Sequence, residues 1–343
     1  MNDIRDYSLE ELEELFKNWQ EPPYHARQVF SWIYQKGIYS FDMMSNLSLE
    51  ARKKLKENLC FKNPKLVELR ESLDGTKKFL FGLEDGNLIE SVMIPQKGRN
   101  SVCLSTQAGC KYGCRFCASG LLGFKRNLSA WEIIAQLIEI NRSMRPHPGG
   151  EGKVTHIVFM GTGEPLDNYD NVLKAIRITN AKDGLSIGAR RITISTAGVI
   201  PGIERLAKEG MQVELSVSLH GADDKTRSAL MPINRKYPLK DLIPACKKYA
   251  LSTRRQVTFE YVLIKDVNCS VRDAGNLAKL LRGWIAKVNL LIYNPIKELV
   301  FKAPCDEEIS AFKQMLQKEG IAVTSRKPRG RDIEGACGQL RLR

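Results

Sequence analysis

Three cysteines with a distinctive spacing, Cys110, Cys114 and Cys117, are the residues of this sequence best suited to chemistry. They follow a predicted strand, so we expect them in the loop between that strand and the next helix. Three thiolates spaced C-x3-C-x2-C can bind three corners of a [4Fe–4S] cluster. The fourth iron then lacks a protein ligand and can chelate a small molecule. The spacing therefore predicts an iron–sulfur centre with one open coordination site.

Zinc is the main alternative to iron at these cysteines. Structural zinc usually takes four ligands, often supplied as pairs of cysteines. No second pair of Cys or His side chains completes such a set near Cys117. Three unbound thiols on one short loop would be an uncommon coincidence. The cluster is therefore the favoured interpretation.

Polar residues also follow several other predicted strands. In barrel-like α/β folds, functional groups lie at the carboxyl ends of the strands. A carboxylate such as Glu164 can accept hydrogen bonds from an ammonium group there. A polar turn residue at any single strand end is unremarkable, but four such ends together predict a rim above the cluster loop. The rim would consist of Gly163, Glu164, Ser195, Ser218, Leu219, His220 and Asn294.

The elements that must position these residues alternate regularly from about residue 100 onward. Strand and helix in repeated alternation predict a parallel sheet with crossover helices. Six such units fit either an incomplete (βα) barrel or a doubly wound sheet, and the pattern does not separate the two. We predict strands at 101–105, 156–160, 191–195, 213–219, 257–264 and 288–293, with helices at 130–140, 171–178, 201–208, 239–249 and 272–282.

The first hundred residues have a different pattern. Residues 8–60 carry apolar positions at helical spacing, interrupted at Pro22-Pro23. Residues 65–95 contain short β-like runs separated by Asp74-Gly75 and Asp85-Gly86, which are hairpin signals. We predict an N-terminal helical accessory domain (1–62), a small β element or linker (63–100), the main α/β domain (101–296) and a C-terminal extension (297–343).

The net charge of the 343 residues is +14, with an isoelectric point near 9.3. A basic protein of this kind often binds a polyanion, usually nucleic acid. The charge recurs along the chain, as in Arg190-Arg191, Arg254-Arg255 and the segment 326–331, and this distribution predicts a folded basic face.

Neither a membrane span nor a secretory signal is evident, because no apolar run is long enough and the N-terminus lacks a basic segment before an apolar one. We therefore expect a cytoplasmic protein without a membrane partner. The nine cysteines are then not a disulfide framework.

Several motifs in order give the chain a specific resemblance. C-x3-C-x2-C is the signature of the radical S-adenosylmethionine (SAM) superfamily. Over essentially its whole length the chain resembles the RlmN/Cfr family of RNA adenosine methyltransferases within it. The GEPL sequence after the second strand and the type of N-terminal module favour the C2-specific RlmN branch. The matching segments are PYHARQVFSWIYQKG, LIESVMIP, SVCLSTQAGCKYGCRFCASG, FMGTGEPLDN, ITISTAGVIP, VSLHGADDKTRSALMPIN, YNP and GACGQL.

The resemblance implies a fold and a set of residue roles. The fold would be a radical SAM incomplete (βα)6 barrel with a small N-terminal helical/β accessory domain. Cys337 would carry the methyl group, Cys103 would resolve the covalent adduct, and Glu90 would accept a proton. The rim residues named above, from Gly163 to Asn294, would contact S-adenosyl-L-methionine, and Cys110, Cys114 and Cys117 would bind the [4Fe–4S] cluster.

The implied reaction makes 2-methyladenosine through an S-methylcysteine and a transient protein–RNA adduct, which a disulfide-forming step releases. The implied substrates are an adenosine in the peptidyl-transferase region of 23S rRNA and the adenosine 3′ of the tRNA anticodon. An electron donor such as flavodoxin or ferredoxin would be needed, and we expect a monomer.

Three alternatives remain open on sequence alone. Methylation at C8, as in Cfr, differs only in the position of the base that is reached. A radical enzyme acting on a protein or a small molecule would leave the Cys103 and Cys337 pair unexplained. A basic RNA-binding module with a structural metal would not be an enzyme at all.

Overall fold

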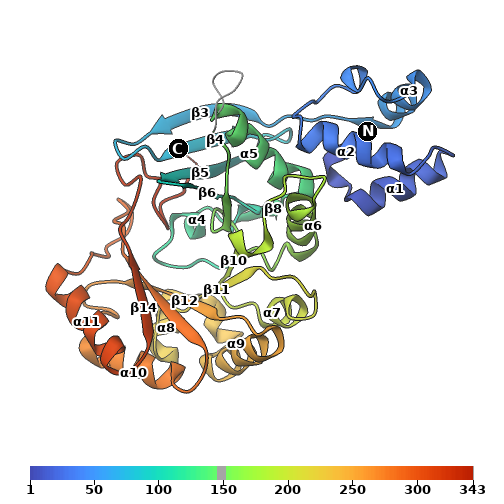
Figure 1. The fold of residues 1–343 in the computed structure, drawn as a ribbon. Coiled ribbons are helices and arrows are strands. Elements are labelled where there is room, and N and C mark those ends of the chain that lie inside the picture. Colours follow the sequence, from blue (N-terminus) through green and yellow to red (C-terminus); the bar gives the residue numbers. More distant parts are fainter. Residues whose placement is uncertain (145–151, 343) are drawn as a thin grey trace.

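A ten-stranded mixed sheet forms the centre of the molecule in this computed structural model (Figure 1). The structure describes residues 1–144 and 152–342; residues 145–151, inside the predicted main domain, and residue 343 lie outside that description. The strand order is β14-β13-β12-β11-β10-β9-β6-β5-β4-β3. Seven strands run parallel: β6 Arg99–Cys103, β9 His156–Phe159, β10 Ile192–Thr196, β11 Glu214–Ser218, β12 Val257–Leu263, β13 Ala286–Ile292 and β14 Ala322–Arg326.

This strand order decides between the two folds that the sequence allowed. The parallel strands follow one another in chain order without the reversal that a doubly wound sheet requires. Among the described residues, β14 bonds only to β13, so the sheet does not close onto β6 and the barrel is incomplete. All six predicted strands are present, and β14 is a seventh that the sequence analysis did not predict.

Helices follow the strands as crossover connections, and the five predicted ones are present with small shifts at their ends. In α10 the buried residues Ala274, Leu277, Ala278 and Leu281 recur at helical spacing, and Ser270 with Asp273 forms a capping box at its start. The main helices after β6 are α5 Ala130–Ser143, α6 Tyr169–Asn180, α7 Ile200–Leu206, α8 Asp224–Leu230, α9 Leu239–Thr253, α10 Val271–Leu281 and α11 Asp306–Lys318.

The hydrophobic core lies on the helix-facing side of the parallel strands, outside the barrel. Along β12, Val257, Phe259 and Tyr261 belong to the main core cluster. The alternate residues Thr258 and Glu260 line cavities inside the barrel. Strand side chains alternate between the two faces of a sheet. The interior of the barrel is therefore partly open and polar instead of packed.

The predicted β element continues this sheet as three antiparallel strands. Asp74-Gly75 and Asp85-Gly86 form the turns between β3 (Lys65–Glu71), β4 (Lys77–Gly82) and β5 (Leu88–Gln96), as predicted. Strand β5 then bonds to β6. The domain boundary expected at residue 100 thus falls within one continuous sheet. At the opposite edge of that sheet lie β14 and the helix α11 before it, both of which belong to the expected C-terminal extension.

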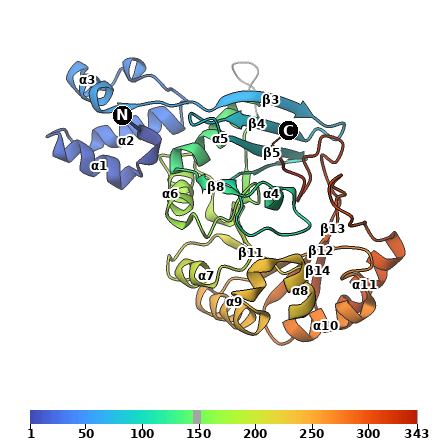
Figure 2. The same cartoon turned by 180° about the vertical axis from the view of Figure 1, so that it is seen from behind.

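The N-terminal helices lie to one side of the sheet, near α5 and α6 (Figures 1 and 2). They are α1 Leu9–Asn18, α2 Tyr24–Tyr34 and α3 Leu49–Asn58, with the short strands β1 (Asn2–Asp3) and β2 (Leu59–Cys60) pairing beneath them. The carboxylate of Asp6 accepts a hydrogen bond (2.9 Å) from the backbone N–H of Trp131 at the start of α5. No helix in the described part of the chain is long and apolar enough to cross a membrane.

Candidate active site

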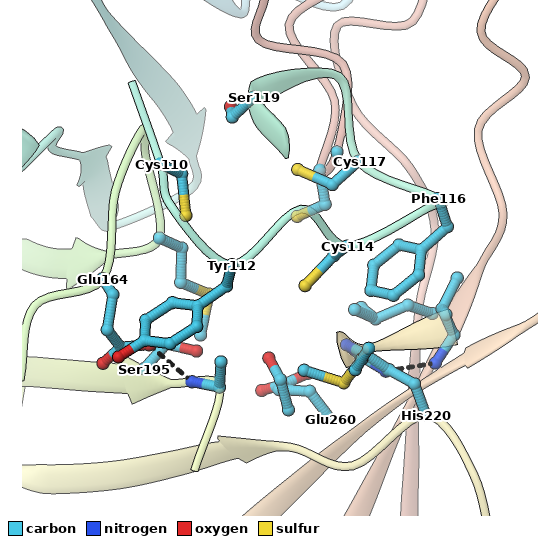
Figure 3. Close-up of a pocket in the computed structure, with 18 of the residues that line it drawn as sticks. Cys110, Tyr112, Cys114, Phe116, Cys117, Ser119, Glu164, Ser195, His220 and Glu260 are labelled. Atoms are coloured by element: carbon cyan, nitrogen blue, oxygen red, sulfur yellow. Dashed lines mark hydrogen bonds between the residues drawn. The ribbon is translucent and has the colours of Figure 1, made fainter. Parts of the chain in front are cut away.

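Cys110, Cys114 and Cys117 lie on the loop between β7 (Gln107–Gly109) and α4 (Ala118–Leu121). Strand β7 pairs with β8 (Phe124–Asn127), and the backbone N–H of Cys110 donates to Gly123 O at 3.0 Å. Gly109 has φ +79°, and a Cβ atom there would overlap the carbonyl oxygen of Gly123. Figure 3 shows the three thiols around one common space.

The arrangement of these thiols fits a cluster that spreads its ligands over several irons. Within residues 1–144 and 152–342, no three His, Cys, Asp or Glu side chains gather closely enough to hold one metal ion. A [4Fe–4S] cluster places each thiolate on a different iron, so it needs ligands farther apart than one zinc ion does. Burial raises the pKa of all three thiols, for Cys110 to about 12. Binding must therefore displace their protons.

The strand ends meet the cluster loop around one cavity, which we call the upper cavity. Its lining includes the three cysteines and most of the predicted rim: Gly163, Glu164, Ser195, Ser218, His220 and Asn294. Leu219 is the exception, because its side chain is fully buried in the core. Its backbone N–H donates to Glu260 O (3.0 Å) and so ties two strand ends together.

Glu164 is buried at the turn after β9. Its carboxylate accepts hydrogen bonds from the backbone N–H groups of Leu166 (3.0 Å) and Ala197 (2.6 Å). Burial raises its pKa to about 7 in spite of these bonds. The preceding Gly163 has φ +108°, and a Cβ atom there would lie 2.6 Å from the Gln107 side chain. The turn therefore requires glycine and fixes the carboxylate beside the cluster loop.

His220 is held in an unusual conformation on the opposite side of the upper cavity (Figure 3). Its backbone has φ +56°, and its Nδ1 accepts a hydrogen bond from Val262 N at 3.0 Å. The ring meets Phe116 edge-on, with centroids 4.7 Å apart. Burial, with a smaller effect from Arg227, lowers the pKa of His220 to about 3, so the imidazole stays neutral.

A second cavity, of about 460 Å³, lies beside the upper one and contains Cys103. We call it the middle cavity. Cys337 lines both cavities, as do Glu260 and Asn294. Cys103 is buried against Val92, Val158 and Leu340. All nine cysteines are free thiols in this structure.

The segment that carries Cys337 is held between the cluster loop and the end of β13. Ala118 N donates to Gly338 O (2.7 Å), and Ser119 Oγ donates to Leu340 O (2.9 Å). The side-chain amide of Asn294 donates to Cys337 O (3.1 Å), while its oxygen accepts from Arg331 Nε (2.7 Å). Asn294 thus positions the Cys337 loop as well as lining the cavity. Cys337 is an exposed residue, and its surroundings, mainly through desolvation of the thiol, raise its pKa.

Two carboxylates lie near this segment, and only one of them was predicted. Glu90 on β5 is fully buried, with Lys78 Nζ at 3.1 Å and Leu342 N donating to it at 3.0 Å, and it lines neither cavity. Glu260 on β12 lines both cavities and accepts from Ser216 Oγ (3.2 Å) and Asn289 Nδ2 (2.6 Å). Sequence analysis missed Glu260. A carboxylate within the otherwise apolar run FEYVL was the available signal.

An incomplete (βα) barrel with three cluster-type cysteines at the carboxyl ends of its strands defines a radical SAM enzyme. The family model "Radical SAM superfamily" matches residues 104–274. The model "Ribosomal RNA large subunit methyltransferase N-terminal domain" matches residues 2–61. Enzymes of this superfamily use a [4Fe–4S] cluster and SAM.

Relatives are similar along the whole chain. A probable dual-specificity RNA methyltransferase RlmN of Clostridium novyi is 44% identical over 342 residues, 99% of this chain and 98% of the relative. The corresponding protein of Dictyoglomus turgidum is 45% identical, with 99% and 97% covered. The crystal structure of a radical SAM methyltransferase from Sphaerobacter thermophilus superimposes with a TM-score of 0.94 at 44% identity and covers 100% of both chains.

The chain belongs to the RlmN family. The predicted family, fold class, enzyme class and cofactors are thereby confirmed. The individual site residues remain predictions.

Proposed function

We propose that this enzyme makes 2-methyladenosine in RNA, with Cys337 as the carrier of the methyl group. The substrates would be the adenosine in the peptidyl-transferase region of 23S rRNA and the adenosine 3′ of the tRNA anticodon. The observation that carries the proposal is the position of Cys337 in the wall between the upper cavity, which holds the cluster cysteines, and the middle cavity, which holds Cys103.

The upper cavity has the residues that the two cofactors need. Cys110, Cys114 and Cys117 would bind the cluster, and the buried carboxylate of Glu164 would bind the ammonium group of SAM. Ser195, Ser218, His220 and Asn294 would make the remaining contacts. When bound, the cofactors supply a transferable methyl group and, after one-electron reduction by a donor such as flavodoxin or ferredoxin, a hydrogen-abstracting carbon radical.

Cys337 and Cys103 would divide the covalent chemistry. Carbon 2 of adenine is electrophilic, so it cannot attack a methyl donor as an amine would. The Cys337 thiol loses its proton and its sulfur accepts the methyl group by displacement. The S-methyl group then loses a hydrogen atom and adds to carbon 2 as a carbon radical, and the adduct becomes closed-shell by losing the C2 proton and one electron, which replaces the electron that the donor supplied. The Cys103 thiolate then attacks the Cys337 sulfur and breaks its bond to the methylene group, which takes up a proton as the methylated base leaves. The two cysteines are left as a transient disulfide, which cytoplasmic thiol reductants reopen.

Loss of the C2 proton needs a nearby base. Glu90 is the acceptor that the family resemblance implies, and its bond to Leu342 N links it directly to the segment that carries Cys337. Opening of that segment would expose its carboxylate. Glu260 is a second candidate, favoured by its place in the wall of both cavities. Comparing the exchange of the C2 proton in Glu90→Gln and Glu260→Gln would separate them.

Replacing each cysteine separately tests the carrier mechanism. Cys337→Ala should leave the protein unmethylated and unattached to RNA. Cys103→Ala should allow methyl transfer and addition but block release, so a protein–RNA crosslink should survive denaturation and run as a shifted band. Mass spectrometry of nucleosides from the wild-type reaction would distinguish 2-methyladenosine from the C8 product.

Cys305→Ala is the matched control, because Cys305 is exposed and lines neither cavity. It should turn over like the wild type, and iron content should be equal in all variants. A Cys103→Ala enzyme with full iron content that turns over normally and forms no crosslink would refute the two-cysteine mechanism.

A further inference from the structure

A third cavity, of about 500 Å³, lies at the amino-terminal ends of the parallel strands, opposite the cluster loop. We call it the basic mouth. Six arginines and one lysine line it, together with His156, and Glu214 is its sole carboxylate among the described residues. Two sequence features that the proposed function does not use, Arg190-Arg191 and Arg254-Arg255, meet here although they belong to different loops.

Most of this positive charge is uncompensated. Arg255 pairs with Glu214, and Arg190 Nε donates to the side-chain oxygen of Gln212 at 2.9 Å. Arg191, Arg254 and Arg326 are exposed, and they form no ion pair with any residue in the described part of the chain. Like charges held together in a concave site repel one another, and an anion entering the site relieves that repulsion. The site therefore favours an anionic ligand.

The interior above the mouth is polar where a closed barrel would be filled. A packed (βα) barrel is filled by branched aliphatic side chains. Here Thr193, Ser216 and Thr258 occupy inward positions of β10, β11 and β12, and Asn289 and Thr324 those of β13 and β14. Thr324 Oγ1 donates to Asn289 Oδ1 (2.9 Å), and Asn289 in turn donates to Glu260. Small hydroxyl and amide groups thus line the mouth, and the bond from Asn289 links it to Glu260, which lines the middle cavity together with Cys337.

Two arginines join the mouth to the middle cavity. Arg99 and Arg326 line both. On β9, His156 lines the mouth and Val158 the middle cavity, and Met160, directly after the strand, lines the middle and the upper cavity. Lys327 and Arg329 add further positive charge to the wall of the middle cavity. The basic surface is therefore continuous with the chamber that contains Cys103 and Cys337.

From this continuity we propose that the basic mouth binds RNA phosphates next to the target adenosine. RNA would approach at the amino-terminal ends of the strands, and the unstacked base would extend inward between Cys103 and Cys337. The cluster and SAM would act from the opposite side. Arginine binds phosphate through paired hydrogen bonds and stays charged, so it suits this role. The inference rests on the proposed function and adds the direction of approach and the residues that hold the backbone.

Reversing charge at the mouth tests the proposal. Arg191 and Arg254 line the mouth but neither of the other cavities. The double variant Arg191→Glu, Arg254→Glu should bind a short RNA stem–loop with an unpaired adenosine about tenfold or more weakly at moderate salt. The log–log salt slope of binding should fall by about one to two, because two phosphate contacts are lost. Iron content and methylation of Cys337 should be unchanged.

The control variant Arg272→Glu, Lys279→Glu changes the net charge equally on the exposed surface of α10, away from the three cavities. It should weaken binding no more than about twofold. Equal weakening by both double variants would reduce the effect to overall charge and overturn the proposal. If the wild-type enzyme carries a methyl group on Cys337 yet binds no RNA, the proposed RNA substrate is wrong. If the wild type binds RNA but the mouth variant binds equally well, only the assignment of the mouth is wrong.

Chemical protection tests the same site in the unaltered protein, so the result does not depend on variants that fold. The stem–loop should protect Arg191 and Arg254 from phenylglyoxal, read by mass spectrometry, and leave Arg272 reactive. Inorganic phosphate at the same phosphate concentration should protect them far less. Equal protection by inorganic phosphate would make this a small-anion site and overturn the assignment to RNA, as would full reactivity in the presence of saturating RNA.

Discussion

His220 is the residue whose surroundings have the clearest energetic consequence. It is buried, keeps a left-handed backbone, and accepts a hydrogen bond through Nδ1, which requires the neutral ring. A histidine whose folded pKa lies below its unfolded value makes the unfolded state bind more protons as the pH falls. Stability is then present at neutral pH and is lost on acidification from about pH 6.5 downward.

We expect this loss to be measurable in the cofactor-free protein. With a folded pKa of about 3, the His220 contribution between pH 6 and pH 4 is about 2 kcal/mol. Asn tolerates the left-handed region and does not titrate, so His220→Asn should remove that part of the pH dependence. Urea unfolding of both proteins across this range measures the difference. Parallel pH profiles would contradict the assignment.

At the scale of elements, the β7–β8 ladder holds the cluster loop in place, and Gly109 is its most constrained position. A side chain at this position would overlap the backbone of Gly123. The positive φ of Gly109 is also unfavourable for any residue with a Cβ atom. Gly109→Ala should therefore destabilise the fold by about 3 kcal/mol or more and lower the iron content. Gly98→Ala is a matched control, since Gly98 has φ +70° and nothing within 4 Å. It should cost only about 1 kcal/mol. Equal unfolding free energies for the two variants would show that the backbone of β7 and β8 can shift to accommodate the methyl group at residue 109 at little cost.

The elements themselves were largely predictable, because their signals are local. Hairpin turns at Asp74-Gly75 and Asp85-Gly86, and helices with apolar residues at regular spacing, depend on neighbouring residues only. Strand β14 escaped prediction because it is largely exposed and so lacks a buried apolar pattern, and what makes it a strand is its register against β13, where Arg326 pairs with Leu291. Glu260 was missed because its role also depends on strand pairing: the sequence does not show which residues the neighbouring strands bring beside its carboxylate.

For the whole molecule, the contact between the N-terminal segment and the barrel includes several polar bonds, among them Lys174 with Glu11 (2.8 Å) and Gln35 with Lys182 O (3.1 Å), and one of them acts on the start of a helix. Asp6 accepts from Trp131 N at the first turn of α5, much as a helix cap does, and Arg5 lies over the Trp131 ring. Asp6→Ala should therefore cost about 1 kcal/mol and speed hydrogen exchange in α1–α3. The exposed pair Glu13–Arg27 offers the comparison, since Glu13→Ala should cost at most a few tenths of that. Unchanged exchange in Asp6→Ala would show that this bond does not help to hold the N-terminal helices on the barrel.

The open, polar barrel interior has a consequence for how such a protein can diversify. Its stability comes mainly from the apolar layer between strands and helices, while Thr193, Ser216, Thr258 and Thr324 lie on the other face of the strands and line the basic mouth. Mutations at these positions leave the packed layer intact, so natural selection can alter the mouth with little penalty in folding. In the laboratory, a library randomised at these four sites should consist mostly of folded proteins. The scaffold is thus open to the evolution of new specificities without first becoming more stable.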